Sequence, residues 1–199
     1  MIFTTPAFVV FFALFFAVHF SLRGEPRKWW LLAASYYFYG SWNALFLLLI
    51  IGSTLVDFYV GRALHATEDQ RRRNRLLWLS CAVNLGALAF FKYANFGIET
   101  LNLLLASLGV GPVSWPAVVL PVGISFYTFQ TLSYTIDVYR GSLKPAKSFL
   151  SFAAFVMYFP QLVAGPIVRA SELLPQLEGG RPRVSSEGVS RGLFLIALG

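Results

Sequence analysis

The sequence predicts an all-α protein, a polytopic transmembrane helical bundle with re-entrant or broken helices. Three observations support this fold class. First, 57% of the 199 residues are hydrophobic and only 13% are charged, whereas a soluble domain averages about 25% charged residues. Second, the apolar residues gather in long uncharged runs that are separated by short basic segments. Third, proline and glycine interrupt several runs, as in membrane helices that are enclosed by protein.

The net charge of +7 comes from these basic segments. Lys and Arg are enriched in the cytoplasmic loops of membrane proteins, so we predict contact with the lipid bilayer and no nucleic-acid partner. The single cysteine, Cys81, cannot form an intrachain disulfide. Neither Cys81 nor the histidines His19 and His65 has the spacing of a metal site. We therefore expect no metal and no bound cofactor.

The first apolar run, residues 2–22, is long enough to span a bilayer. No basic residue precedes this run, which argues against a secretory signal peptide. Arg23, Arg27 and Lys28 follow it. This order predicts that the N-terminus lies outside and that the basic segment lies in the cytoplasm.

The run 29–61 is too long for a single span, because one helix would extend about 50 Å. The sequence Gly-Ser-Trp-Asn at 40–43 predicts a break, giving elements 29–39 and 42–60. The basic segment 62–75 that follows is the strongest candidate for a cytoplasmic loop. Both flanking segments then lie inside, so the run either crosses and returns as a tight hairpin or re-enters.

The run 76–91 predicts the next span, ending at the outer face at Lys92 and Tyr93. Asn84 and Gly86 at its middle predict close helix packing. A short helix over 97–108 and a turn should then lie at the outer surface. Asp57, in the preceding element, is a lone carboxylate that either pairs with a neighbouring helix or reaches the interface.

The stretch 120–141 organises the chain, because it has the length of a span but is unusually polar. We predict a helix over 123–137 that lies centrally in the bundle, with its polar faces towards a cavity, since hydrocarbon offers polar groups no partner. In the alternative interpretation the threonines bond to carbonyls of the preceding turn and Gln130 joins two helices. The two polar faces comprise Gln130, Tyr134 and Asp137, and Thr128, Thr131 and Thr135.

The run 148–168 is uncharged but is broken by Phe159-Pro160-Gln161 and by Gly165-Pro166. It either crosses the membrane or re-enters. A polar loop, 172–191, follows, with an amphipathic piece over 170–177. Residues 192–199 open a further apolar helix, so we expect residues 1–199 to be the N-terminal part of a single integral-membrane domain, truncated within a helix.

The residues alone show no catalytic constellation: the chain has no nucleophile elbow, no phosphate-binding glycine loop and no paired carboxylates in one element. A polar central helix beside a broken helix fits an enzyme with a tunnel, a transporter or flippase, or a non-catalytic membrane scaffold. A transporter would often carry an inverted repeat, and none is visible in these residues.

Four runs carry a resemblance to a known family: LPVGISFYTFQTLSYTIDVYRG at 120–141, FFKYANF at 90–96, ASYYFYGSW at 34–42 and FPQLVAGPIVR at 159–169. They resemble the N-terminal half of the membrane-bound O-acyltransferases. The subgroup they resemble is the alginate O-acetylase type, which is related to the D-alanyl transfer protein of teichoic acid synthesis.

The resemblance implies acyl transfer, in this subgroup O-acetyl transfer, to an exported polysaccharide such as alginate. It also implies a cytoplasmic donor, either acetyl-CoA or a carrier-bound acyl group, a bacterial cytoplasmic (inner) membrane location, and periplasmic acetylation partner proteins. The family's catalytic histidine lies in a Trp-His context on a later helix, and no Trp-His pair occurs here. We therefore predict no catalytic residue, and expect this piece alone to be inactive. The candidate substrate-binding residues, which would shape or support the tunnel, are Gln130, Asp137, Tyr139, Arg140, Gln161 and Arg169.

Overall fold

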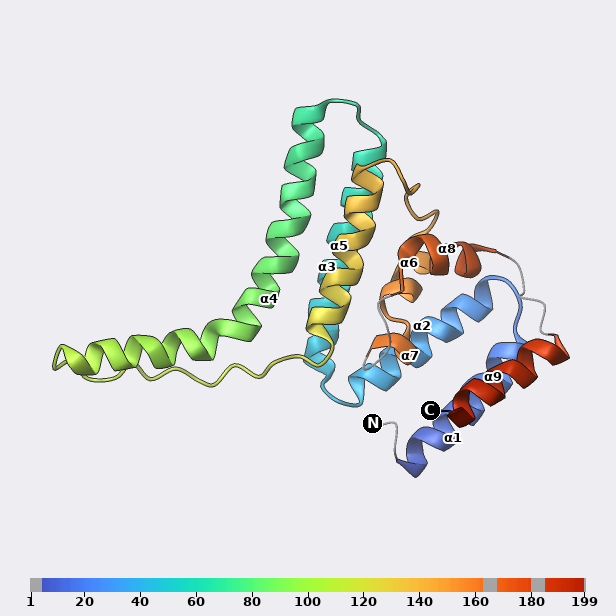
Figure 1. Cartoon of the computed structure of the whole chain (residues 1–199), viewed down its shortest axis with the longest axis horizontal. Coiled ribbons are helices and arrows are strands. Elements are labelled where there is room, and N and C mark those ends of the chain that lie inside the picture. Colours follow the sequence, from blue (N-terminus) through green and yellow to red (C-terminus); the bar gives the residue numbers. More distant parts are fainter. Residues whose placement is uncertain (1–4, 163–167, 180–184, 199) are drawn as a thin grey trace.

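The computed structural model describes residues 5–162, 168–179 and 185–198. All regular secondary structure in these ranges is helical, so the all-α prediction is confirmed. The nine helices of the described ranges (Figure 1) are α1 (Pro6–Ser21), α2 (Glu25–Gly40), α3 (Ala44–His65), α4 (Gln70–Ser107), α5 (Ile124–Tyr139), α6 (Phe149–Val156), α7 (Phe159–Leu162), α8 (Ala170–Glu178) and α9 (Ser186–Leu198).

Helices α3, α5 and the first part of α4 lie side by side and form a three-helix bundle (Figure 1). Among the described helices, α3 and α4 are long and apolar enough to cross a membrane. Their length and composition agree with membrane association, while the predicted polytopic arrangement stays a prediction. Helices α3 and α5 pack tightly at Gly61, where a Cβ atom would lie 2.6 Å from the Tyr134 hydroxyl.

In the second part of the fold, α2 packs against α1, α6 and α7, and α8 packs against α6. The ring of Phe159 is fully buried there. Phe159, the first residue of α7, contacts the ring of Phe15 edge-on at 4.9 Å between centroids and that of Phe11 at 5.3 Å. On α2 it contacts the ring of Phe38 at 5.5 Å. Edge-to-face pairs of this kind add to the free energy of apolar burial.

The predicted break between α2 and α3 is confirmed. Helix α2 ends at Gly40 and α3 begins at Ala44. The side chain of Asn43 caps α3, because its Oδ1 accepts a hydrogen bond of 2.9 Å from the Leu45 amide. Helix α2 begins at Glu25, before the predicted residue 29, and Pro26 stands in its first turn, where proline is well tolerated.

The predicted end of a helix at Lys92 and Tyr93 is wrong, because α4 continues as one helix of 38 residues. The segment expected as a separate helix over 97–108 is its continuation, since no proline stops the chain and a glycine such as Gly97 costs a helix only about 1 kcal/mol. The basic residues Arg71–Arg75 also belong to α4 rather than to a loop. Helix α4 begins after Asp69, whose Oδ1 accepts a 3.0 Å hydrogen bond from the Arg71 amide.

Asn84 is buried, as predicted, but Gly86 is not a packing contact, since a Cβ atom there would meet nothing within 4 Å. Helix α5 begins after Gly123, close to the predicted boundary. Gly123 has a φ of 75°, and a Cβ atom at this position would lie 2.6 Å from the Leu162 carbonyl oxygen. Only glycine satisfies both conditions without strain.

The predicted interruption at Phe159-Pro160 is confirmed, because α6 ends at Val156 and α7 begins at Phe159. The predicted interruption at Gly165-Pro166 lies outside the described residues. The amphipathic piece over 170–177 is confirmed as α8, which buries Leu174 and Leu177. Helix α9 begins at Ser186, six residues before the predicted apolar start at residue 192.

Candidate functional site

A buried polar cluster joins α3, α4 and α5 in the interior of the three-helix bundle. Its centre is Asp57, whose side chain has no exposed surface. The carboxylate accepts a 2.5 Å hydrogen bond from the Ser80 hydroxyl, and both of its oxygens lie within hydrogen-bond distance of the Asn84 amide nitrogen, at 3.0 and 2.9 Å. Ser80 and Asn84 are four residues apart, so both present their side chains on one face of α4.

Two threonines of α5 complete the cluster. The Thr131 hydroxyl lies 3.2 Å from both the Asn84 Oδ1 and the Thr128 carbonyl oxygen. The Thr135 hydroxyl lies 3.5 Å from Asp57 Oδ1 and 3.4 Å from Ser80 Oγ. One threonine face of α5 therefore points towards protein partners and not only towards its own preceding turn. We call these five residues, Asp57, Ser80, Asn84, Thr131 and Thr135, the Asp57 cluster.

Within the described residues, the Asp57 carboxylate has hydrogen-bond donors but no cationic partner. Across the described ranges the ion pair present is that of Lys147 with Glu178, at 3.9 Å. A buried ionisable side chain is costly unless its polar atoms are hydrogen-bonded, so Asp57 marks a structural centre of the three-helix bundle. Sequence reasoning left Asp57 open between pairing with a helix and reaching the interface, and the structure shows pairing. The sequence reasoning did not find the partners of Asp57; the signal that could have indicated them is the Ser80 and Asn84 pair, four residues apart in an apolar run.

Gln130 joins α5 to α6, as in the alternative interpretation of its polar face. Its side chain is 2% exposed, and its Nε2 donates to the Phe155 carbonyl oxygen at 3.0 Å. In an unbroken helix the Phe159 amide would donate to this carbonyl. Here the Phe159 amide instead donates to the Ser35 hydroxyl of α2 at 3.4 Å. Gln130 and Ser35 thus satisfy the two backbone groups that the break between α6 and α7 releases.

Gln161 is buried on α7, where its Oε1 has no hydrogen-bond partner. An unpaired buried acceptor is unusual, because buried polar atoms are nearly always satisfied. Gln161 is therefore the predicted site residue with unused hydrogen-bonding capacity at a buried position. It lies in the element that follows the break, next to Leu162, whose carbonyl contacts Gly123.

The remaining predicted residues lie elsewhere. Tyr139 is at the end of α5, where its hydroxyl donates to Asn74 Oδ1 and accepts from Gln70 Nε2, both at 2.7 Å. Asp137 is half-buried, and Arg140 is exposed at the C-cap of α5. Arg169 is exposed just before α8. The six residues therefore do not form one site among themselves, and their role in substrate binding stays a prediction.

Arg73, in the first turn of α4, is hydrogen-bonded to the C-terminal ends of both α3 and α5. Its guanidinium donates to the Leu64 carbonyl in the last turn of α3 and to the carbonyl of Tyr139, the last residue of α5. It also donates to the Thr67 carbonyl at 3.1 Å and lies over the Tyr139 ring at 5.4 Å. A guanidinium can do this because it presents several donors in a fixed fork.

A basic groove lies at the same end of the three-helix bundle, where α3 and α5 end and α4 begins. Two adjoining hollows of about 300 and 510 Å³ share His65, Pro145, Ala146 and Lys147 in their walls. Arg62 and Lys144 add positive charge, and Glu178 is the one carboxylate in the lining. Lys147 is held by Glu178, which also accepts a 2.7 Å hydrogen bond from the Lys147 amide. This lining favours an anionic ligand.

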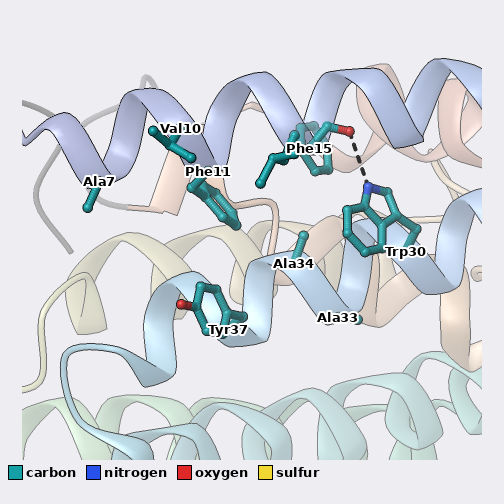
Figure 2. Close-up of a pocket in the computed structure, with 9 residues that line it drawn as sticks. Ala7, Val10, Phe11, Phe15, Trp30, Ala33, Ala34 and Tyr37 are labelled. Carbon is teal, nitrogen blue, oxygen red and sulfur yellow. Dashed lines mark hydrogen bonds between the residues drawn. The ribbon is translucent and has the colours of Figure 1, made fainter.

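A third hollow, between α1 and α2, is apolar instead of basic. It has a volume of about 660 Å³ and an uncharged lining of apolar, alanine and aromatic side chains. Figure 2 shows the Trp30 indole at its edge, where Nε1 donates to the Phe15 carbonyl oxygen at 3.2 Å. This third hollow therefore offers apolar surface, and it lacks the convergent polar groups that fix a polar substrate.

Comparison with known proteins identifies relatives along almost the whole chain. The chain is 42% identical over 178 residues to a probable alginate O-acetylase of Pseudomonas aeruginosa, an alignment that covers 88% of this chain and 34% of that protein. It is 40% identical over 195 residues to a probable alginate O-acetylase of Pseudomonas putida, covering 96% of this chain and 40% of that protein. A peptidoglycan O-acetyltransferase of Helicobacter pylori is 31% identical over 230 residues, covering 100% of this chain and 43% of that protein.

No family model and no solved structure matches the chain. The chain spans about a third to two-fifths of the length of the curated relatives. That span contains the four runs at 34–42, 90–96, 120–141 and 159–169. The resemblance to the alginate O-acetylase type that these runs indicated agrees with the names of the relatives. The chain is thus a homologue of part of the alginate O-acetylases, and its resemblance to the membrane-bound O-acyltransferases of this type is confirmed.

Proposed function

We propose that the full-length protein is a membrane-bound O-acyltransferase that transfers an acetyl group to an exported polysaccharide such as alginate. The observation that carries the proposal is 39–42% identity to several alginate O-acetylases over most of this chain. The similarity to a peptidoglycan O-acetyltransferase supports the same chemistry, an ester formed on a carbohydrate hydroxyl.

The described part supplies the framework of such an enzyme. Acyl transfer needs a base that activates a hydroxyl and donors that stabilise the developing oxyanion, and both must be held in fixed positions. The Asp57 cluster fixes α3, α4 and α5, and Gln130 ties this unit to the broken helix α6–α7. The residues that perform the chemistry belong to the rest of the full-length protein.

The basic groove is our candidate for the donor side. Acetyl-CoA carries several phosphate groups, and a carrier that holds an acyl group as a phosphopantetheine thioester carries one. Arg62, Lys144 and Lys147 offer positive charge for either donor. The groove lies at the same end of the bundle as Arg71, Arg72, Arg73 and Arg75, and we propose that this end faces the cytoplasm because basic residues are enriched there.

The proposed location is the bacterial cytoplasmic membrane, with the N-terminus outside. Two candidate spanning helices and the relatives named as O-acetylases support a membrane location. Acceptance of the acetyl group by an exported polymer would take place on the outer side, together with periplasmic partner proteins. Labelling of a cysteine introduced before α1 with a membrane-impermeant reagent on intact cells tests the orientation, and protection of that cysteine would contradict it.

The activity is tested by acetyl incorporation. The full-length gene is expressed in an alginate-producing host that lacks its own acetylase, and ester-linked acetate in the exported polymer is measured. We expect acetate to appear with the intact protein and to disappear when the histidine expected downstream in a Trp-His context is replaced by alanine. Equal incorporation by this variant would contradict the proposal, provided that both proteins reach the membrane in equal amounts.

A further inference from the structure

The distal part of α4 forms an arm that leaves the bundle. Figure 1 shows the first part of α4 alongside α3 and α5, and the rest of α4 running across their direction. Phe91 still belongs to the bundle, because its ring contacts that of Phe46 at 6.1 Å. The extended segment 108–120 returns along the same helix towards α5 (Figure 1). We call residues 92–120 the arm.

The arm is fastened by two asparagine clamps. The Asn95 amide donates to the Val118 carbonyl and accepts from the Val118 amide, both at 2.8 Å. Seven residues further on, Asn102 does the same with Val113, at 3.2 and 2.8 Å. Each clamp satisfies a donor and an acceptor of a non-helical backbone. Such internal satisfaction is required of backbone that lies where water is scarce.

The surface of the arm is apolar although little of it is buried. Lys92 and Glu99 are its charged residues, and they lie in its first third. The largest exposed fractions reach three-quarters of the side chain, at Leu103 (74%) and Leu108 (75%). The exposed large apolar side chains of the arm are Tyr93, Phe96, Leu101, Leu103, Leu104, Leu108, Val110, Val113, Trp115, Val119 and Leu120.

Such a surface is not that of an element surrounded by water, because contiguous exposed apolar patches mark contact with a membrane or a partner. The direction of the arm favours contact with a membrane over contact with a partner protein. If α3 and the first part of α4 cross the bilayer, an element that runs across them lies parallel to the membrane plane. Lys92, Tyr93 and Trp115 are of the types that concentrate at the membrane–water interface.

We propose that the arm is a lipid-binding element that lies flat in one interface of the bilayer, with its leucines and aromatic side chains in the boundary between head groups and acyl chains. In the orientation proposed above this is the outer interface, at the end of the bundle opposite the basic groove. This inference goes beyond the acyltransferase function, since it concerns how the protein is held in the membrane. It would stand if the transferred group or the acceptor were different.

Site-directed spin labelling of the full-length protein tests the proposal. With native cysteines replaced, Phe96→Cys, Leu103→Cys and Leu108→Cys are labelled singly with a nitroxide. All three positions are mostly exposed, so the labels leave the packing intact. The proteins are reconstituted in vesicles of phosphatidylethanolamine and phosphatidylglycerol. Collision rates are measured with oxygen, which partitions into lipid, and with a water-soluble nickel chelate.

Two labelled positions calibrate the scale. Leu55→Cys, at the middle of α3 and 37% exposed, reports the lipid interior, and Arg72→Cys, exposed in the first turn of α4, reports water. We expect all three arm labels to collide more with oxygen than with nickel. We also expect their depths to agree within about 5 Å, because an interfacial helix inserts its apolar face only about 5–10 Å.

Three other results would overturn the proposal. Collision with nickel equal to that of the Arg72→Cys label would place the arm in water. Low collision with both reagents would show that protein covers the arm, either another segment of the full-length chain or a partner. A depth that changes steadily from Phe96 to Leu108 would show that the arm enters the bilayer instead of lying in its plane.

Discussion

Replacing Asp57 by alanine tests the role of the buried polar cluster. The change removes the acceptor of the Ser80 hydroxyl and of the Asn84 amide. The Asn84 amide nitrogen keeps the Ser80 carbonyl at 3.0 Å, and Ser80 can turn towards Thr135 at 3.4 Å. Three links between helices are lost, because Thr135 also loses the Asp57 carboxyl at 3.5 Å. A hydrogen bond contributes about 0.5–1.5 kcal/mol in soluble proteins and about 0.6 kcal/mol on average within membranes. For three bonds we expect a loss of stability of about 2–4 kcal/mol.

The measurement is unfolding of the full-length protein in detergent, by titration with a denaturing detergent or by heat, followed by size-exclusion chromatography. Ser53→Ala is the matched control. Ser53 is buried on the same helix, and its hydroxyl donates only to the Ile50 carbonyl of that helix, at 3.0 Å. This control should cost less than about 0.5 kcal/mol, within the range of substitutions that break no contact between elements. If Asp57→Ala is as stable as Ser53→Ala, the cluster does not hold the bundle together.

Three further changes have expected outcomes. Gly123→Ala should destabilise the protein by at least about 1–2 kcal/mol, the cost of a left-handed alanine. The new Cβ atom would also meet the Leu162 carbonyl at 2.6 Å. In the same melting experiment Gly86→Ala, whose Cβ atom meets nothing within 4 Å, should be neutral or stabilising. Gln130→Leu leaves the Phe155 carbonyl unpaired, so we expect a loss of about 1–3 kcal/mol, and an unchanged melting temperature would show that this bond is dispensable. Arg140 is the exposed C-cap of α5, at the end of the bundle that carries the basic groove, so it could add positive charge for the donor. Arg140→Ala should then lower acetyl transfer while membrane insertion, measured by fractionation, stays intact; full transfer would exclude Arg140 as a donor contact.

Local signals in the sequence predicted much of the fold. The break at 40–43, the start of α5 at Gly123 and the break before α7 all follow from glycine, proline or asparagine, whose effects on the backbone are local. The continuity of α4 was missed for the opposite reason. Lys92 and Tyr93 have the composition of an interface, but neither residue stops a helix, and nothing local distinguishes a helix that bends there from one that ends.

The candidate site was less predictable, because its residues come from three helices. The periodicity of α5 shows that Thr131 and Thr135 share a face, but not what that face meets. Asp57 and Asn84 become one cluster only when α3 and α4 are packed against α5. The partner of Gln130 is a backbone carbonyl, which leaves no trace in a sequence pattern.

The fork of Arg73 restricts how this protein can move. Its guanidinium holds the carbonyl ends of α3 and α5 at one level, so neither helix can slide along the other without breaking at least one of these bonds. Lysine at this position would have the charge but not the planar fork that reaches both carbonyls. These bonds hold α3 and α5 in register, so we expect a shape change of this part of the protein to take place between the three-helix bundle and the segments around it.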